Sequence, residues 1–85
     1  MSLAMLSVAL ERQRQDEKWG PGRELPGELW MVILMEEVGE LAQEILEARH
    51  KEGAPDGNMR AEAVQVAAVA VAFIEALDRA SGVSP

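Results

Sequence analysis

Hydrophobic and polar residues follow a helical period in three stretches of this chain, and glycine or proline separates the stretches. In the first stretch, Leu3, Leu6 and Leu10 recur three or four residues apart, and residues 2–19 contain neither glycine nor proline. Such spacing places the leucines on one face of a helix. A Gly-Pro-Gly sequence at 20–22 ends the pattern, so we predict a helix over residues 2–19.

The second stretch predicts a long helix from about Gly27 to about His50, after a connector that contains Pro26. Its apolar stripe repeats every three or four residues and consists of Leu34, Val38, Leu41 and Ile45. Gly39 lies inside this helix, where glycine costs about 1 kcal/mol relative to alanine. An interior glycine often marks the close approach of a neighbouring helix.

The third stretch follows a loop over residues 51–58 that holds two glycines and a proline. We predict a helix over residues 59–80, capped by Asp56 or Asn58 and ended by Ser81-Gly82. This helix is apolar almost all round, which is typical of a buried helix. Two further helices in the same subunit cannot cover it completely, so the pattern favours a partner subunit.

We therefore predict an all-α fold, with one helical domain over residues 1–85 and three helices in each subunit. The short loop between the second and third helices favours their antiparallel packing. An 85-residue chain buries only about 60–65% of its extended surface, yet 48% of this one is hydrophobic. It has no cysteine, so neither disulfides nor thiolate zinc sites can stabilise the core. We expect a homo-oligomer, a dimer or a tetramer, assembled into a helix bundle.

The formal net charge of −7 argues against nucleic acid and anionic membrane surfaces as partners. The longest apolar run is too short to cross a bilayer, which takes about 20 residues. No signal-peptide pattern is visible at the start of the chain, so a cytoplasmic location is expected. An acidic chain of this kind fits a protein that collects cations.

Five acids of the second helix fall within an arc of roughly 100°: Glu36, Glu37, Glu40, Glu44 and Glu47. Like charges one turn apart destabilise an isolated helix by about 0.2–0.5 kcal/mol per pair. No lysine lies between Leu25 and His50 to relieve the repulsion. One interpretation is a solvated acidic face. The other is that Glu37 and Glu40, one turn apart, hold a hard divalent cation.

The third helix has few polar residues before its C-terminal end, and Glu62 and Gln65 are three positions apart on one face. Antiparallel packing would bring them toward Glu37 and Glu40, although a rise of about 1.5 Å per residue leaves the two pairs offset by several ångströms. Taken alone, Glu62 is better explained as a first-turn acid that favours the dipole of its helix.

Together these residues resemble the MazG-like all-α nucleoside triphosphate pyrophosphohydrolases, whose signature is E-E-x-x-E, a spacer, and E-x-x-D. Here the first half reads Glu36-Glu37-Val-Gly-Glu40 and the second reads Glu62-x-x-Gln65. The upstream residues 11–20, which end in Trp-Gly, are similar to those of short phage and bacterial members. The resemblance covers most of the chain and implies an oligomeric helix bundle.

The resemblance implies cleavage of a nucleoside triphosphate, ribo or deoxyribo, to the monophosphate and pyrophosphate. It assigns the metal, Mg²⁺ with Mn²⁺ as an alternative, to Glu37, Glu40 and Glu62, with Gln65 as a further ligand and Glu36 as a supporting acid. The catalytic set is then Glu36, Glu37, Glu40 and Glu62. Gln65 replaces the Asp of the family pattern, so it brings an amide oxygen without a charge.

Candidate substrate-binding residues are Lys18, Trp19 and Arg60. The two cations could meet phosphate oxygens, and Trp19 could stack on a base, although a tryptophan near a loop is more often a core anchor. A magnesium-dependent pyrophosphohydrolase is the expected function. The alternative is a catalytically inactive relative that binds nucleotide, metal or a protein partner, and Gln65 is the residue that keeps this alternative open.

Overall fold

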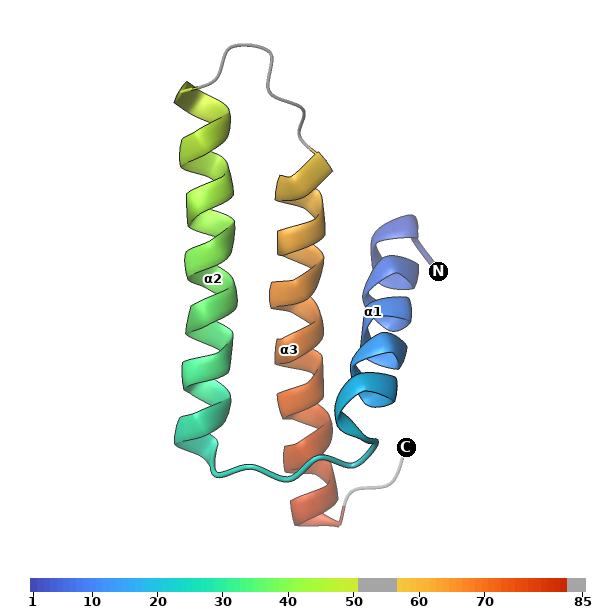
Figure 1. Cartoon of the computed structure of the whole chain (residues 1–85). Helices are drawn as coiled ribbons and strands as arrows, with labels where there is room; N and C mark the ends of the chain where they lie inside the picture. The colour runs from blue at the N-terminus through green and yellow to red at the C-terminus, as the bar shows by residue number, and fades with distance from the viewer. Residues whose placement is uncertain (51–56, 83–85) are drawn as a thin grey trace.

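Three helices make up the part of the chain that the computed structural model describes, residues 1–50 and 57–82. They are α1 (Leu3–Trp19), α2 (Gly27–His50) and α3 (Gly57–Ser81), and no strand occurs within the described residues (Figure 1). The prediction of an all-α chain of three helices is confirmed.

Local hydrogen bonds set the two ends of α1. The hydroxyl of Ser2 accepts a hydrogen bond from the backbone N–H of Met5 at 3.1 Å, which satisfies one free donor of the first turn. At the other end, the backbone N–H of Gly20 donates to the carbonyl of Asp16 at 2.9 Å. Gly20 has φ +90°, which glycine adopts without the steric cost that a side chain would bring.

The start of α3 differs from the prediction, and its end agrees with it. The helix begins at Gly57, so Asn58 lies in the first turn and the prediction that Asn58 caps the helix is wrong. Asp56, the alternative cap, lies outside the described residues. At the C-terminal end, Gly82 has φ +75° and its backbone N–H donates to the carbonyl of Arg79 at 3.2 Å.

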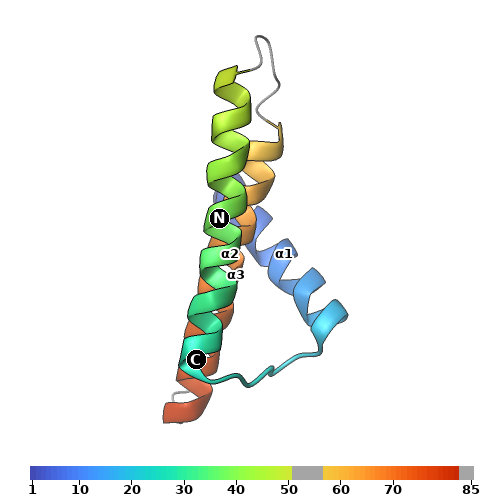
Figure 2. The same cartoon turned by 60° about the vertical axis from the view of Figure 1, so that its left-hand side comes forward.

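The helices form one thin layer with α3 in the middle. Helix α2 packs antiparallel to α3 on one side, and α1 packs on its other side (Figure 1). Within the described residues, α1 and α2 do not pack on each other. Figure 2 shows that α1 is inclined to the α2–α3 pair. The molecule measures 49 × 30 × 19 Å, so much of each helix faces solvent.

The core is small and lies where α2 meets the second half of α3. Trp30 is its largest member, only 4% exposed, and its ring stacks on Phe73 with the centroids 5.8 Å apart. The other buried residues are the small side chains Ala68, Val69 and Ala72 of α3, which let the neighbouring helices approach closely. The expectation that α3 is buried holds for this central part, whereas Ile74 and Leu77 are exposed.

None of the described helices is long and apolar enough to cross a membrane.

Replacement of Trp30 by alanine should unfold much of the protein, because a large-to-small change in a core costs about 3–5 kcal/mol and small domains are only marginally stable. Trp19, which is 56% exposed, is the matched control, and its replacement by alanine should change stability little. Urea denaturation followed by far-ultraviolet circular dichroism measures both effects. Equal midpoints for the two variants would contradict this account of the core.

Candidate metal centre and adjacent cavity

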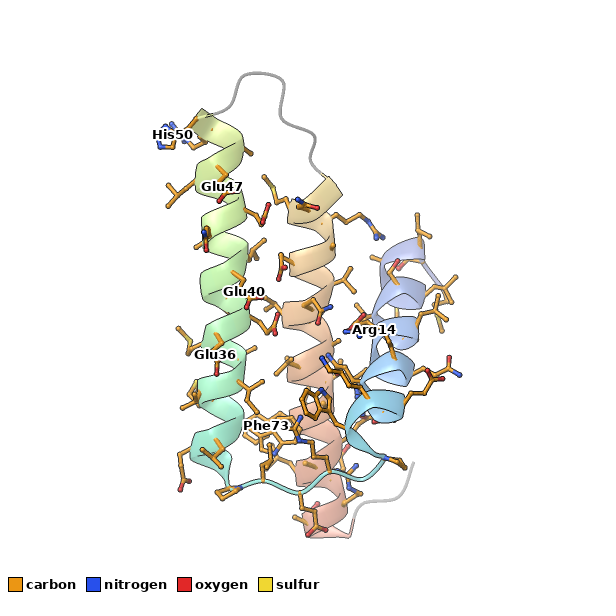
Figure 3. The ribbon with its side chains drawn as sticks, viewed as in Figure 1. Arg14, Glu36, Glu40, Glu47, His50 and Phe73 are labelled. Carbon is orange, nitrogen blue, oxygen red and sulfur yellow. The ribbon has the colours of Figure 1, made fainter. Side chains whose placement is uncertain are left out.

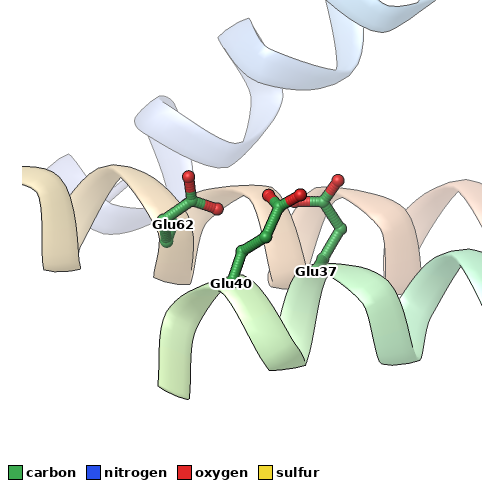
Figure 4. Close-up of side chains that lie close together, drawn as sticks. All are labelled: Glu37, Glu40 and Glu62. Atoms are coloured by element: carbon green, nitrogen blue, oxygen red, sulfur yellow. The ribbon is translucent and has the colours of Figure 1, made fainter. Parts of the chain in front are cut away.

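Three carboxylates from two helices converge beside the core. Glu37 and Glu40 extend from α2 toward α3, and Glu62 meets them from α3 (Figure 4). One oxygen of each carboxylate lies within 4.8 Å of the corresponding oxygens of the other two. The structure therefore brings together the three residues that the sequence analysis named as charged metal ligands.

The relative length of the two helices explains how Glu62 reaches the pair on α2. The C-terminal end of α2 extends beyond the N-terminal first turn of α3 (Figure 1). The first residue of α3 therefore lies beside α2 some way before the C-terminal end of α2. As a result Glu62, the sixth residue of α3, is level with the middle of α2. The offset expected from helical rise alone is removed in this way.

Burial and mutual repulsion both disfavour ionisation in the cluster. Burial is the main cause that raises the pKa of Glu37 above its usual range, and further increases come from the charges of Glu40, Glu62, Glu36 and Glu11. Burial likewise raises the pKa of Glu62 most, and smaller increases come from the charge of Glu40, a hydrogen bond with the Glu40 carboxyl and the charge of Glu44. The three carboxylates are thus held together at an electrostatic cost that a cation would offset.

The oxygens of the cluster suit a hard divalent cation. Oε2 of Glu62 is buried and has no hydrogen-bond partner among the described residues. An anionic oxygen in that position is costly unless a donor or a cation meets it. Mg²⁺ prefers carboxylate oxygens and keeps several waters, so three carboxylates open to solvent at the exposed Glu40 fit its requirements.

The rest of the acidic face behaves differently along α2. Glu36 and Glu47 are exposed, as the interpretation of a solvated face expects, and Figure 3 shows both side chains on α2. Glu37 and Glu44 are half-buried. The single acidic arc of the sequence is thus divided into an outer, solvated edge and an inner edge that faces α3.

A cavity of about 330 Å³ adjoins the cluster and is lined by all three helices and the α1–α2 connection. Glu37 belongs both to this cavity and to the cluster, and Glu36 and Gln65 line the cavity beside it. Gln65 lies one turn beyond Glu62 on α3.

Five of the chain's eight lysines and arginines line this cavity: Arg12, Arg14, Lys18, Arg23 and Arg79. Such a concentration is unexpected in a chain with a net charge of −7. The ammonium of Lys18 lies 4.9 Å from the ring centroid of Trp19, and the guanidinium of Arg23 lies 5.0 Å from the same centroid. The part of the cavity that Lys18, Trp19 and Arg23 form is therefore cationic and aromatic.

Two of the cavity arginines are already paired with acids. Arg12 donates to Asp16 at 2.9 Å and to Glu75 at 2.8 Å, and Arg14 forms a bidentate ion pair with Glu11. Within the described residues, Lys18, Arg23 and Arg79 have no carboxylate within ion-pair distance. These three cations are the ones free to meet an anionic ligand.

Arg79 links the C-terminal end of α3 to the α1–α2 connection at this cavity. Its guanidinium donates to the backbone carbonyl of Arg23 at 3.0 Å, which ties the α1–α2 connection to the last turn of α3. Nothing in the spacing of the sequence indicates Arg79, because its approach to residue 23 depends on how the helices pack.

The predicted substrate-binding residues are divided between two places. Lys18 and Trp19 line the cavity, and Trp19 is exposed rather than a core anchor. Arg60 is not part of the cavity lining, and its guanidinium donates to the hydroxyl of Ser7 on α1 at 3.0 Å. Trp30 also lines the cavity, and its buried indole N–H has no hydrogen-bond partner among the described residues.

Comparison of the chain with protein-family models, with curated proteins and with solved structures found no match. A function must therefore be inferred from the residues of the site themselves.

The raised pKa values of Glu37 and Glu62 predict a pH dependence of stability in metal-free protein. A carboxyl whose pKa is higher in the folded state binds more protons there, so the free energy of unfolding falls as the pH rises from about 4.3, the ordinary Glu value, through the raised values. Glu37→Gln removes one of these charges and should raise the melting temperature at pH 7 in EDTA by a few degrees.

Thermal melts followed by circular dichroism, with EDTA and with added Mg²⁺, test this prediction. Mg²⁺ should stabilise the wild type more than Glu37→Gln, because binding to the folded state alone raises stability. Glu47→Gln, an exposed acid of the same helix, should melt like the wild type in both conditions. A lower melting temperature for Glu37→Gln in EDTA would show that the carboxylates do not repel one another.

Proposed function

We propose that this protein is a magnesium-dependent nucleoside triphosphate pyrophosphohydrolase, which converts a nucleoside triphosphate and water into the monophosphate and pyrophosphate. The observation that carries the proposal is the convergence of Glu37, Glu40 and Glu62 within 4.8 Å. A second support is the sequence signature, which resembles that of the MazG-like enzymes at the same three positions.

Glu37, Glu40 and Glu62 would hold the metal, with Gln65 able to add an amide oxygen or to hold a metal-bound water. Mg²⁺, or Mn²⁺ in its place, would neutralise charge on the phosphates and lower the pKa of a bound water. Glu36 is the supporting acid at the exposed edge of the same cavity. Without a cation, the carboxylates would repel a triphosphate.

The cavity provides a binding place for the remainder of the nucleotide. Lys18 and Arg23, which have no acidic partner within ion-pair distance among the described residues, would bind phosphate oxygens. The exposed ring of Trp19 is available to stack on a base. Arg60 is not assigned to phosphate binding in this proposal, because it lies outside the cavity lining and donates a hydrogen bond to Ser7 of α1.

An assembly of subunits belongs to the same proposal. Fourteen large hydrophobic side chains of the described residues are at least 40% exposed, while only four residues are buried. A homo-oligomer, a dimer or a tetramer, would cover part of this surface and complete a helix bundle. A cytoplasmic location goes with the proposed substrate, since nucleoside triphosphates are abundant there.

A catalytically inactive binding module is the second candidate, and Gln65 is the observation that favours it. An amide in place of a carboxylate reduces the charge available to a metal ion and cannot act as a base. The same cavity could then bind nucleotide or metal without turnover, or the bundle could bind a protein partner.

Pyrophosphate release from a panel of ribo- and deoxyribonucleoside triphosphates, with and without Mg²⁺, tests the enzyme. Glu37→Gln and Glu40→Gln should each reduce magnesium-dependent turnover roughly a hundredfold or more, because each removes a metal ligand. Glu47→Gln serves as the matched control and should retain activity. No turnover of any nucleotide by folded wild-type protein would rule out the enzymatic proposal.

Gln65→Asp separates the two candidates. If the scaffold is competent, a restored carboxylate should strengthen metal binding and increase pyrophosphate release at low Mg²⁺ concentration. Gln13→Asp makes the same chemical change at an exposed position of α1 outside the cavity lining and should have no effect on pyrophosphate release. Nucleotide binding by both Gln65 forms without turnover in either would favour the binding module.

A further inference from the structure

Helix α2 carries a second apolar face that no part of the described chain covers. Along it, the residues with the least polar side chains recur at alternating intervals of three and four: Val32, Met35, Gly39, Ala42 and Leu46. All five are exposed, and the three larger side chains among them are 52–56% exposed. Such a repeat is the a/d pattern of a helix that packs along a partner helix. We refer to these five residues as the α2 seam.

The α2 seam lies on the side of α2 opposite to α3. The residues of α2 that are buried or half-buried, among them Trp30, Glu37 and Leu41, occupy the arc that faces α3. At about 100° per residue, Gly39 and Leu46 lie close to 180° from the centre of that arc. Figure 1 agrees, because α2 forms one edge of the layer and has a neighbouring helix on one side only.

Gly39 is the unusual member of the seam. A Cβ atom built at this position would meet nothing within 4 Å, so packing inside the subunit does not require glycine there. Glycine nevertheless reduces the stability of a helix interior relative to alanine. A small residue at the centre of an apolar stripe, next to Ala42 in the repeat, is what two closely crossing helices require.

The α2 seam is complementary to itself in the antiparallel direction. When Gly39 of one copy lies against the same residue of a second copy, Val32 comes opposite the partner's Leu46, and Met35 lies within one residue of the level of the partner's Ala42. A long side chain thus meets a short one on both sides of the centre. This is the arrangement of an isologous interface, in which each contact occurs twice about a two-fold axis.

Charges at the two ends of the seam agree with the antiparallel direction. Glu28 lies on the same face in the first turn of α2, and Arg49 lies close to this face in the last turn. The antiparallel register places Glu28 near the partner's Arg49 at both ends of the pair. A parallel pair would instead bring each charge against its own copy.

We propose that a second copy of this chain docks on the α2 seam, antiparallel and with its two-fold axis at Gly39. This inference rests on the homo-oligomer proposed above and names its interface. The paired stretch from Val32 to Leu46 is about 21 Å long. Glu36 flanks the seam and is level with the partner's Ala42, so the second copy reaches the edge of the candidate catalytic cavity.

Light scattering coupled to gel filtration tests the interface through mass rather than activity. The wild type should have twice the 9.3 kDa mass of the chain. Leu46→Glu, which is 56% exposed in the subunit, should weaken association roughly tenfold or more, because a charge would be buried. Leu77→Glu is the matched control on α3, since Leu77 is 53% exposed and lies outside the seam.

Gly39→Leu separates association from folding. Leucine favours the helix more than glycine does, so the subunit should remain helical by circular dichroism while the dimer dissociates. A dimer that persists in both Gly39→Leu and Leu46→Glu would overturn the seam but leave the oligomer in place. A wild type that is monomeric throughout would overturn both, whereas nucleotide hydrolysis is tested separately by pyrophosphate release.

Because the chain has no cysteine, single cysteines can report the direction of the pair. Gly39→Cys should form a disulfide-linked dimer on mild oxidation, since its two copies meet at the axis, whereas Leu46→Cys should not. Val32→Cys mixed with Leu46→Cys should form the mixed dimer. Efficient cross-linking of Leu46→Cys to itself would overturn the antiparallel arrangement.

Discussion

The packing of Trp30 against the small residues of α3 is the interaction on which the rest of the structure depends. Val69 and Ala72 leave room for the indole, and the stacked ring of Phe73 holds its plane. This contact fixes how far α2 is shifted along α3. Because Glu37 lies two turns after Trp30 on the same face of α2, the core also determines where the candidate metal ligands of α2 meet α3.

The candidate site continues this core along the α2–α3 pair, toward the C-terminal end of α2 and the N-terminal end of α3. On α3, Glu62 precedes Val69 by two turns, as Glu37 follows Trp30 on the antiparallel α2. The helix faces that carry the apolar core residues therefore also carry Glu37 and Glu62, and both carboxylates lie in partly buried positions. The raised pKa values of Glu37 and Glu62 are the physical consequence, first of this burial and then of the charges of the neighbouring carboxylates.

Charge is separated within the subunit in a way that the net value of −7 conceals. The carboxylates lie between α2 and α3, whereas the cations gather at the cavity near the α1–α2 connection. Glu37 lies at the boundary between the two regions. A ligand with a phosphate chain at one end and an aromatic group at the other would match this gradient, and a nucleotide has both.

Much of the fold and part of the site could be predicted from the sequence. Helical periodicity and the glycines at 20 and 82 predicted the helices to within two residues, and the i, i+3 spacing of Glu37 and Glu40 pointed to the candidate metal ligands of α2. To predict that Glu62 meets Glu37 and Glu40, one must know how far α2 and α3 overlap, and no local sequence pattern contains this information. Arg79 was missed for the same reason, because only tertiary packing brings it to residue 23.

The thin layer explains why the residues of α2 are distributed as they are. A helix at the edge of a bundle normally needs one apolar face, yet α2 has apolar residues on the side of α3 and again along the α2 seam. Two apolar faces leave only a narrow arc for charge, so the five acids are crowded into it and no lysine separates them. The crowding that looks unfavourable in an isolated helix therefore accompanies the two apolar faces of α2, and one edge of the acidic arc supplies the carboxylates that meet Glu62.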